Sequence, residues 1–151
     1  MFSPRQIIYI TPFYFKNGNK PKPKYFIVLA NDGDQTIVAS LTTRTNHVPS
    51  FVTQAHGCIN LDERCYNAYV FEPGRVVGDS GFFFPDPRPT FIYGGEVDDF
   101  DIEYLESKYA IEGIDYEVKD TLKEEEYKAI IKCLQSSRSV KRKIKRLLPS
   151  L

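Results

Sequence analysis

The sequence lacks the features of secreted, disulfide-stapled and membrane-spanning proteins. Its only cysteines, Cys58, Cys65 and Cys133, form an odd set without a CxxC pair, so they predict neither a disulfide framework nor a structural zinc site. Reduced thiols in a cytosol are expected. The N-terminal segment has an apolar run of only four residues, Ile7 to Ile10, before Pro12, so it predicts no signal peptide and no membrane span. A soluble, cytoplasmic protein is the expectation.

Motifs of cofactor chemistry are also missing. The chain has no GxxxxGK[ST] loop, no GxGxxG after a strand, no HExxH helix and no GxSxG elbow. The acidic stretch EVDDFDIEYLE, from Glu96 to Glu106, lacks the turn glycine and the regular ligand spacing of a calcium-binding loop. We therefore expect no nucleotide cofactor and no metal.

Charge is balanced overall but divided into blocks. Twenty acidic and twenty basic residues give a net charge of zero, which argues against a uniformly basic, nucleic-acid-coating surface. Five carboxylates lie between Asp98 and Glu106, six basic groups between Arg138 and Arg146, and further lysines between Lys16 and Lys24. The C-terminal basic block is interpreted as a solvated helix face, with a surface for RNA or an acidic partner as the alternative.

The pattern of apolar and turn-forming residues changes near residue 95. Before it, short apolar runs are separated by proline, glycine and asparagine, which is typical of a small, curved all-β unit. After it, the capping-box spacing of Thr121 and Glu124 leads into apolar residues at helical intervals. The prediction is one domain over residues 1–151, mainly β with α: a small β barrel over 1–95, followed by packed helices over 96–151.

The stretch KPKPKYFIVLANDGDQTIVASLTTRTNH, from Lys20 to His47, predicts a β-hairpin. Its two apolar runs, Tyr25 to Ala30 and Thr36 to Leu41, flank NDGD, which has the residues of a tight turn. An antiparallel pair places the entry of the first strand beside the exit of the second. Lysines at that entry should therefore lie near the residues Thr42 to Arg44.

The order of a basic, proline-rich entry, the strand YFIVLA, a turn, the strand IVASL and then TTR resembles the core of the MazF/PemK family of toxin endoribonucleases. The resemblance covers about the first 50 residues, and more loosely the segments GRVVGDSGFFF and TFIY. It implies an SH3-like barrel, a homodimer, metal-independent cleavage of single-stranded RNA, and neutralisation by an antitoxin protein. It also places Lys24 at the family's catalytic Arg and Thr42 at its catalytic Thr or Ser. The family's Arg-Pro pair is replaced here by Lys24-Tyr25.

Metal-free RNA cleavage requires groups that bind the phosphate and move protons. Lys24 and Thr42 are the predicted catalytic pair, with Lys24 donating to the phosphoryl oxygens and Thr42 orienting the phosphate. The predicted RNA-binding residues are Lys20, Lys22, Thr43, Arg44 and His47, of which His47 has an ordinary pKa suited to proton transfer. In the alternative, purely structural interpretation, the threonine hydroxyls form hydrogen bonds with backbone groups, and both His47 and His56 belong to surface loops.

Two functional hypotheses remain open at this point. One is the toxin-like endoribonuclease; the other is a catalytically inactive SH3-like module that binds RNA or a protein partner. Eleven Phe and ten Tyr are many for a monomer of this size, which predicts a homodimer or a stable partner complex.

Overall fold

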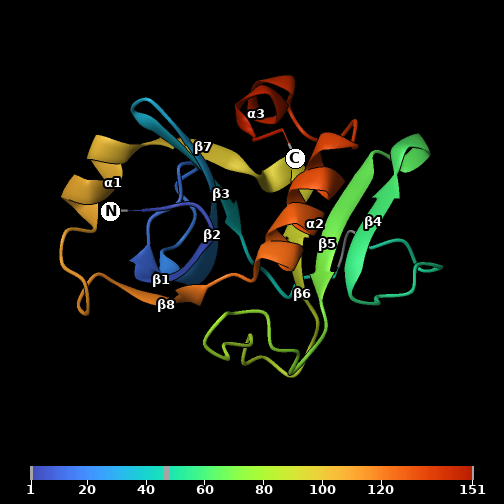
Figure 1. Ribbon diagram of the computed structural model, residues 1–151, viewed down its shortest axis with the longest axis horizontal. Coiled ribbons are helices and arrows are strands. Elements are labelled where there is room, and N and C mark those ends of the chain that lie inside the picture. Colours follow the sequence, from blue (N-terminus) through green and yellow to red (C-terminus); the bar gives the residue numbers. More distant parts are fainter. Residues whose placement is uncertain (1, 46–47, 151) are drawn as a thin grey trace.

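The structure is a computed structural model that describes residues 2–45 and 48–150 (Figure 1). The predicted site residue His47 lies outside these described residues. The strands are β1 (Gln6–Phe13), β2 (Lys22–Asp32), β3 (Gln35–Ser40), β4 (Gly57–Leu61), β5 (Tyr66–Phe71), β6 (Thr90–Tyr93), β7 (Asp98–Asp101) and β8 (Tyr116–Thr121). The α-helices are α1 (Ile102–Lys108), α2 (Glu124–Gln135) and α3 (Arg142–Leu147), and short 3-10 turns span Asp62–Arg64 and Gly94–Glu96.

The strands form two antiparallel sheets. One has five strands in the order β7-β3-β2-β1-β8, and the other has three in the order β4-β5-β6. The expectation of a mainly β chain with a few helices is therefore confirmed. Within the described residues neither sheet closes on itself, so the finer expectation of a closed, SH3-like barrel is not confirmed.

The predicted hairpin is confirmed. Strands β2 and β3 pair antiparallel, with Phe26 opposite Ser40 and Asp32 opposite Gln35. Gly33 has a φ of 61° and supplies the left-handed conformation that a tight turn of this length requires. Local turn chemistry and two β-rich runs are thus sufficient to set this pairing.

The expectation of an all-helical segment after residue 95 is wrong in two places. Strand β7 pairs with β3, and β8 pairs with β1, so both edges of the five-stranded sheet come from this later part of the chain. The capping box of Thr121 and Glu124 does not form either, because Thr121 is the last residue of β8 and no side chain caps α2. Pairing with an existing sheet edge outweighs the weak local helix signal of these short segments.

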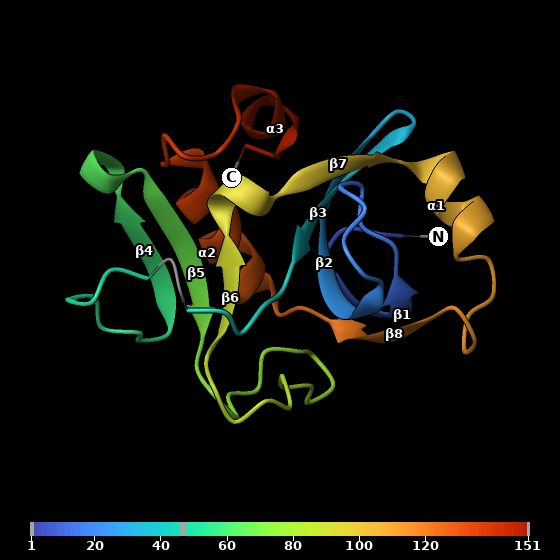
Figure 2. The ribbon, with the colours of Figure 1, turned by 180° about the vertical axis from the view of Figure 1, so that it is seen from behind.

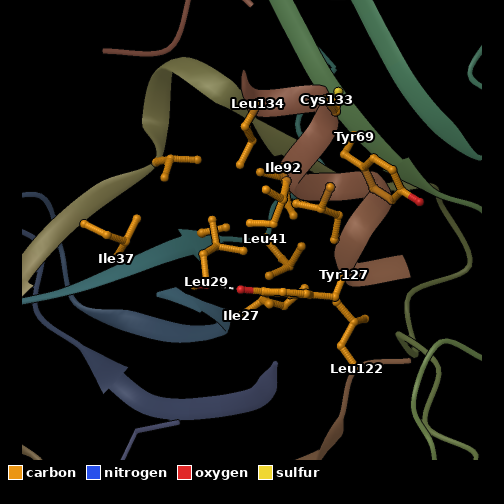
Figure 3. Close-up of a cluster of buried hydrophobic side chains, with 14 of the residues drawn as sticks. Ile27, Leu29, Ile37, Leu41, Tyr69, Ile92, Leu122, Tyr127, Cys133 and Leu134 are labelled. Atoms are coloured by element: carbon orange, nitrogen blue, oxygen red, sulfur yellow. Dashed lines mark hydrogen bonds between the residues drawn. The ribbon is translucent and has the colours of Figure 1, made fainter. Parts of the chain in front are cut away.

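The main core lies where α2 packs between the two sheets (Figures 1 and 2). Figure 3 shows Ile27 and Leu29 of β2 facing Ile92 of β6 and Tyr127 of α2. The Tyr127 hydroxyl donates to the backbone oxygen of Leu29, which fixes the helix against the large sheet. A second apolar cluster, including Phe26, Val28, Phe100 and Leu105, covers the opposite face of that sheet beneath α1.

A disulfide joins α2 to the small sheet. Cys133 of α2 and Cys58 of β4 are bonded to each other, whereas Cys65 is free and exposed. The expectation of three reduced thiols is therefore wrong for two of them, because partners 75 residues apart in sequence meet only when α2 packs on β4. Among the described residues, no helix combines the length and apolarity that crossing a bilayer requires.

Candidate functional site

Lys24 lies near the start of β2, beside the residues that follow β3. The backbone N–H of Leu41 donates to the oxygen of Tyr25 at 3.0 Å, which holds the two chain segments side by side. The Lys24 ammonium in turn donates to the oxygen of Leu41 at 2.7 Å. The predicted meeting of the first strand's entry with the second strand's exit is therefore confirmed.

The environment of Lys24 favours its neutral form. Burial is the largest cause, followed by the charges of Lys22 and Arg44, and Glu96 opposes them; together they lower the pKa of Lys24 to about 8. An ordinary lysine has a pKa near 10.5. With this lowered pKa, Lys24 can exchange its proton nearer neutral pH than an ordinary lysine can.

A groove opens beside Lys24 with a volume of about 940 Å³. We call it the lysine groove; its charged lining residues are Lys16, Lys20, Lys22, Lys24, Arg44, Glu96, Asp98 and Lys141, and apolar residues such as Phe15 and Phe26 complete its wall. Ligand sites commonly have volumes of this order, from roughly 300 to 1,000 Å³. The groove can therefore hold more than a single phosphate.

The charges in the lysine groove are unbalanced. Its two carboxylates are both engaged: Asp98 pairs with Lys16 at 3.2 Å, and Glu96 pairs with Arg44 at 2.8 Å. The other four cations, Lys20, Lys22, Lys24 and Lys141, make no ion pair within the part of the chain that the structure describes. Such a set of cations attracts polyanions, although the whole chain is neutral.

Thr42 and Arg44 form a linked unit rather than two independent groups. The Thr42 hydroxyl oxygen accepts hydrogen bonds from the backbone N–H and the Nε of Arg44, at 3.2 and 3.3 Å. The Arg44 guanidinium also donates to both oxygens of Glu96, at 2.8 and 2.9 Å. Thr42 is buried, so in this arrangement its hydroxyl orients Arg44.

The predicted residues divide between two neighbouring hollows. Lys22 and Lys24 line the lysine groove together with Lys20 and Arg44. The same two lysines also line a smaller hollow with Thr42 and Thr43. Lys22 and Lys24 thus lie between the threonine hydroxyls of the smaller hollow and the Arg44 guanidinium of the lysine groove. His47 lies outside the described residues.

Several groups near the site had no clear signal in the sequence. Lys141 belongs to the C-terminal basic block, for which the sequence leaves a solvated helix face and a surface for RNA or an acidic partner as alternatives, and no local pattern places it in the groove. Nothing local indicated that Glu96 would hold Arg44, because the two are 52 residues apart. The described residues contain no cluster of three or more His, Cys, Asp or Glu side chains that could hold a metal ion.

The interpretation of His56 as a surface loop residue is wrong. Its side chain is buried, and its Nε2 lies 2.8 Å from Oε1 of Glu126, which also accepts from the Tyr69 hydroxyl at 2.8 Å. His56 Nδ1 accepts from the backbone N–H of Glu72, so Nε2 carries the proton that is donated to Glu126. Among the described residues, those of this buried network do not line the lysine groove; the network joins α2 to the small sheet.

Comparison of the chain with protein-family models, with curated proteins and with solved structures found no match. The resemblance to the MazF/PemK family therefore stays a prediction, and function has to be argued from the residues themselves.

Proposed function

We propose that the protein cleaves single-stranded RNA without a metal and binds the scissile phosphate at Lys24. The observation that carries the proposal is the position of Lys24: a half-buried cation with a pKa lowered to about 8, at the edge of a groove with four lysines free of ion pairs in the described chain. Phosphate groups are the common ligands of such cation clusters, and single-stranded RNA is bound in positively charged grooves.

The reaction divides the work between the substrate and the protein. The 2′-oxygen attacks phosphorus, its bond to phosphorus forms as the bond to O5′ breaks, and the products are a 2′,3′-cyclic phosphate and a 5′-hydroxyl. One proton leaves the 2′-hydroxyl and one reaches O5′. The Lys24 ammonium would stabilise the charge on the phosphoryl oxygens, and with a pKa of about 8 it is a better acid for O5′ than an ordinary lysine.

The remaining groups have supporting roles in this proposal. Lys20 and Lys22 would bind neighbouring phosphates, and Thr42 would hold Arg44 in place through the two hydrogen bonds described above. Arg44 would exchange Glu96 for a phosphate, because its planar fork binds either group in the same way. His47, predicted from the sequence as an RNA-binding residue suited to proton transfer, would in this proposal accept the 2′-hydroxyl proton.

A second candidate function is RNA binding without cleavage. The specific observation in its favour is that Arg44 is already bound to both oxygens of Glu96. Unless RNA displaces that carboxylate, Arg44 cannot bind the phosphate at Lys24 through its planar fork. The homodimer and the antitoxin partner also remain predictions.

The two functions can be separated by assaying purified protein with a long single-stranded RNA in EDTA. Loss of a charged contact to the transition state should slow cleavage by Lys24→Ala about a hundredfold or more. The matched control is Lys132→Ala, which removes an exposed lysine of α2 outside the lysine groove. Cleavage by Lys24→Ala at the wild-type rate would disprove the proposal, and Lys24-dependent binding without any cleavage would establish the second function.

A further inference from the structure

A second hollow lies next to the lysine groove. We call it the arginine pocket; its main polar lining is Arg64, Tyr66, Tyr93, Glu96, Arg138 and Ser139. Residues Gly95 and Glu96 line both the pocket and the groove. The segment before α3 also borders both, because Arg138 and Ser139 face the pocket and Lys141 faces the groove.

Two buried hydroxyls in the wall of the arginine pocket have no hydrogen-bond partner within the described chain. They are the hydroxyls of Tyr66 and Ser139, and Tyr66 is only 7% exposed. Buried polar groups are nearly always paired, so unpaired ones point to a ligand or water that completes them. The Oδ1 of Asn67, another lining residue of the pocket, is unpaired as well; it packs against Gly94, where an added Cβ would lie 2.2 Å away.

The pocket is rich in hydrogen-bond donors. The guanidinium groups of Arg64 and Arg138 form no ion pair with the described residues, although Arg64 lies over the ring of Phe51. Burial raises the pKa of the Tyr66 phenol, so it keeps its proton and can donate it. The lining has a single carboxylate, Glu96, and Arg44 already occupies both of its oxygens.

We infer that the arginine pocket binds uracil or guanine, through the carbonyl oxygen at C4 or C6 respectively, from the RNA strand whose backbone lies in the lysine groove. The inference rests on the RNA binding proposed above and adds base selectivity to it. Unstacked bases of single-stranded RNA bind against guanidinium planes and aromatic rings and are read by their edges. The guanidinium groups of Arg64 and Arg138 only donate, so they match O4 of uracil or O6 of guanine, whereas the amino groups of cytosine and adenine would meet donor with donor there.

Uracil and cytosine allow a test that needs no variant. Uracil has the acceptor O4 where cytosine has an amino donor, and N3 is a donor in uracil and an acceptor in cytosine. We would measure the binding of fluorescently labelled 2′-fluoro heptamers of uridine and of cytidine, which lack the 2′-hydroxyl nucleophile and so survive the assay. The uridine heptamer should bind wild type about fivefold or more tightly than the cytidine heptamer, the effect of one good base contact.

Two conservative substitutions locate the selectivity. Tyr66→Phe removes only the unpaired hydroxyl, and Arg138→Lys keeps the charge but loses the planar fork. Each should reduce the preference for uridine toward parity while leaving cytidine binding within about twofold, since phosphate contacts set that baseline. The matched controls are Tyr104→Phe on α1 and Arg142→Lys on α3, both exposed and outside the pocket, and both should keep the preference.

The same measurements test base selectivity in the arginine pocket separately from RNA binding in the lysine groove. If both heptamers bind equally well and binding depends on Lys24, the base pocket is disproved and RNA binding stands. The base pocket is equally disproved if wild type prefers uridine but both variants keep that preference. If neither heptamer binds, or binding is unaffected by Lys24→Ala, RNA binding in the lysine groove is disproved and the base pocket with it.

Discussion

Lys24 differs from the other cations of the site in how its charge is balanced. Arg44 is bound to Glu96 and Lys16 to Asp98, but Lys24 donates to a neutral backbone oxygen, that of Leu41. A neutral partner compensates poorly for the loss of hydration, which is why burial is the main cause of the lowered pKa. An anionic ligand such as phosphate would supply the missing countercharge.

This balance predicts that RNA affinity falls as pH rises. In the free protein the pKa of Lys24 is about 8, and bound phosphate, which stabilises the ammonium, raises it. Affinity should therefore be constant below pH 7 and decline above pH 8, by up to about tenfold at pH 9. The measurement is a titration of the 2′-fluoro cytidine heptamer at several pH values and constant ionic strength.

Lys24→Arg is the matched control for that titration. Arginine keeps its charge throughout this pH range, so the decline should disappear in the variant. If the wild type and Lys24→Arg show the same pH profile, another group is responsible and Lys24 does not hold the phosphate as a cation.

Helix α2 is attached to the small sheet by polar contacts as well as by its apolar face. Glu126, in its first turn, accepts from His56 and Tyr69, and Asn67 of β5 donates to the oxygen of Cys133 at 3.2 Å. Burial, and after it the hydrogen bond to Glu126, raises the pKa of the Tyr69 phenol, which keeps it a donor. The buried carboxylate is thus matched by donors from the sheet and not exposed to solvent.

The attachment predicts a large cost for removing that carboxylate. Glu126→Ala leaves the Tyr69 hydroxyl and the His56 Nε2–H buried without an acceptor, and should lower the free energy of unfolding by about 2–5 kcal/mol. Urea denaturation measures the change. The adjacent, exposed Glu125→Ala should change stability by less than about 0.5 kcal/mol. Equal stabilities of the two variants would show that the buried network contributes little.

Elements with strong local signals were predictable, and those that depend on distant partners were not. The β2–β3 hairpin follows from the turn at Gly33, and its register brings Lys24 to Leu41 and Thr42. Strand β7 has only four residues, three of them aspartates, and forms because β3 offers it an edge. For the same reason the sequence indicated the lysines of the groove but not Glu96, which enters from a turn far along the chain.

Opposite charge blocks are joined when the chain folds. Asp98 and Asp99 of β7 pair with Lys16 from the N-terminal part and with Lys143 of α3, at 3.2 and 2.9 Å. Because exposed pairs contribute little individually, their main effect here is on the charge of the lysine groove. They neutralise two carboxylates of the acidic block and leave the groove's other lysines to attract an anion.

The bond between Cys58 and Cys133 links α2 covalently to the small sheet, while the Tyr127 hydroxyl and the apolar core join the same helix to the large one. The bond closes a loop of 75 residues, which contains β5, β6, β7 and β8. Reducing the bond removes this constraint from the unfolded chain and should lower the free energy of unfolding by about 2–4 kcal/mol.

We therefore expect dithiothreitol to lower the urea midpoint of the wild type, and a Cys58→Ala, Cys133→Ala double variant to be less stable and insensitive to the reductant. The matched control is Cys65→Ser, because Cys65 is exposed and free and its loss should leave both stability and reductant sensitivity unchanged. Alkylation of the urea-unfolded protein with and without prior reduction, read by mass spectrometry, tests the premise. One thiol should react without reduction and three after it, and unfolding is needed because Cys133 is buried in the native protein. Three reactive thiols in the unreduced protein would show that packing alone holds α2 on the small sheet.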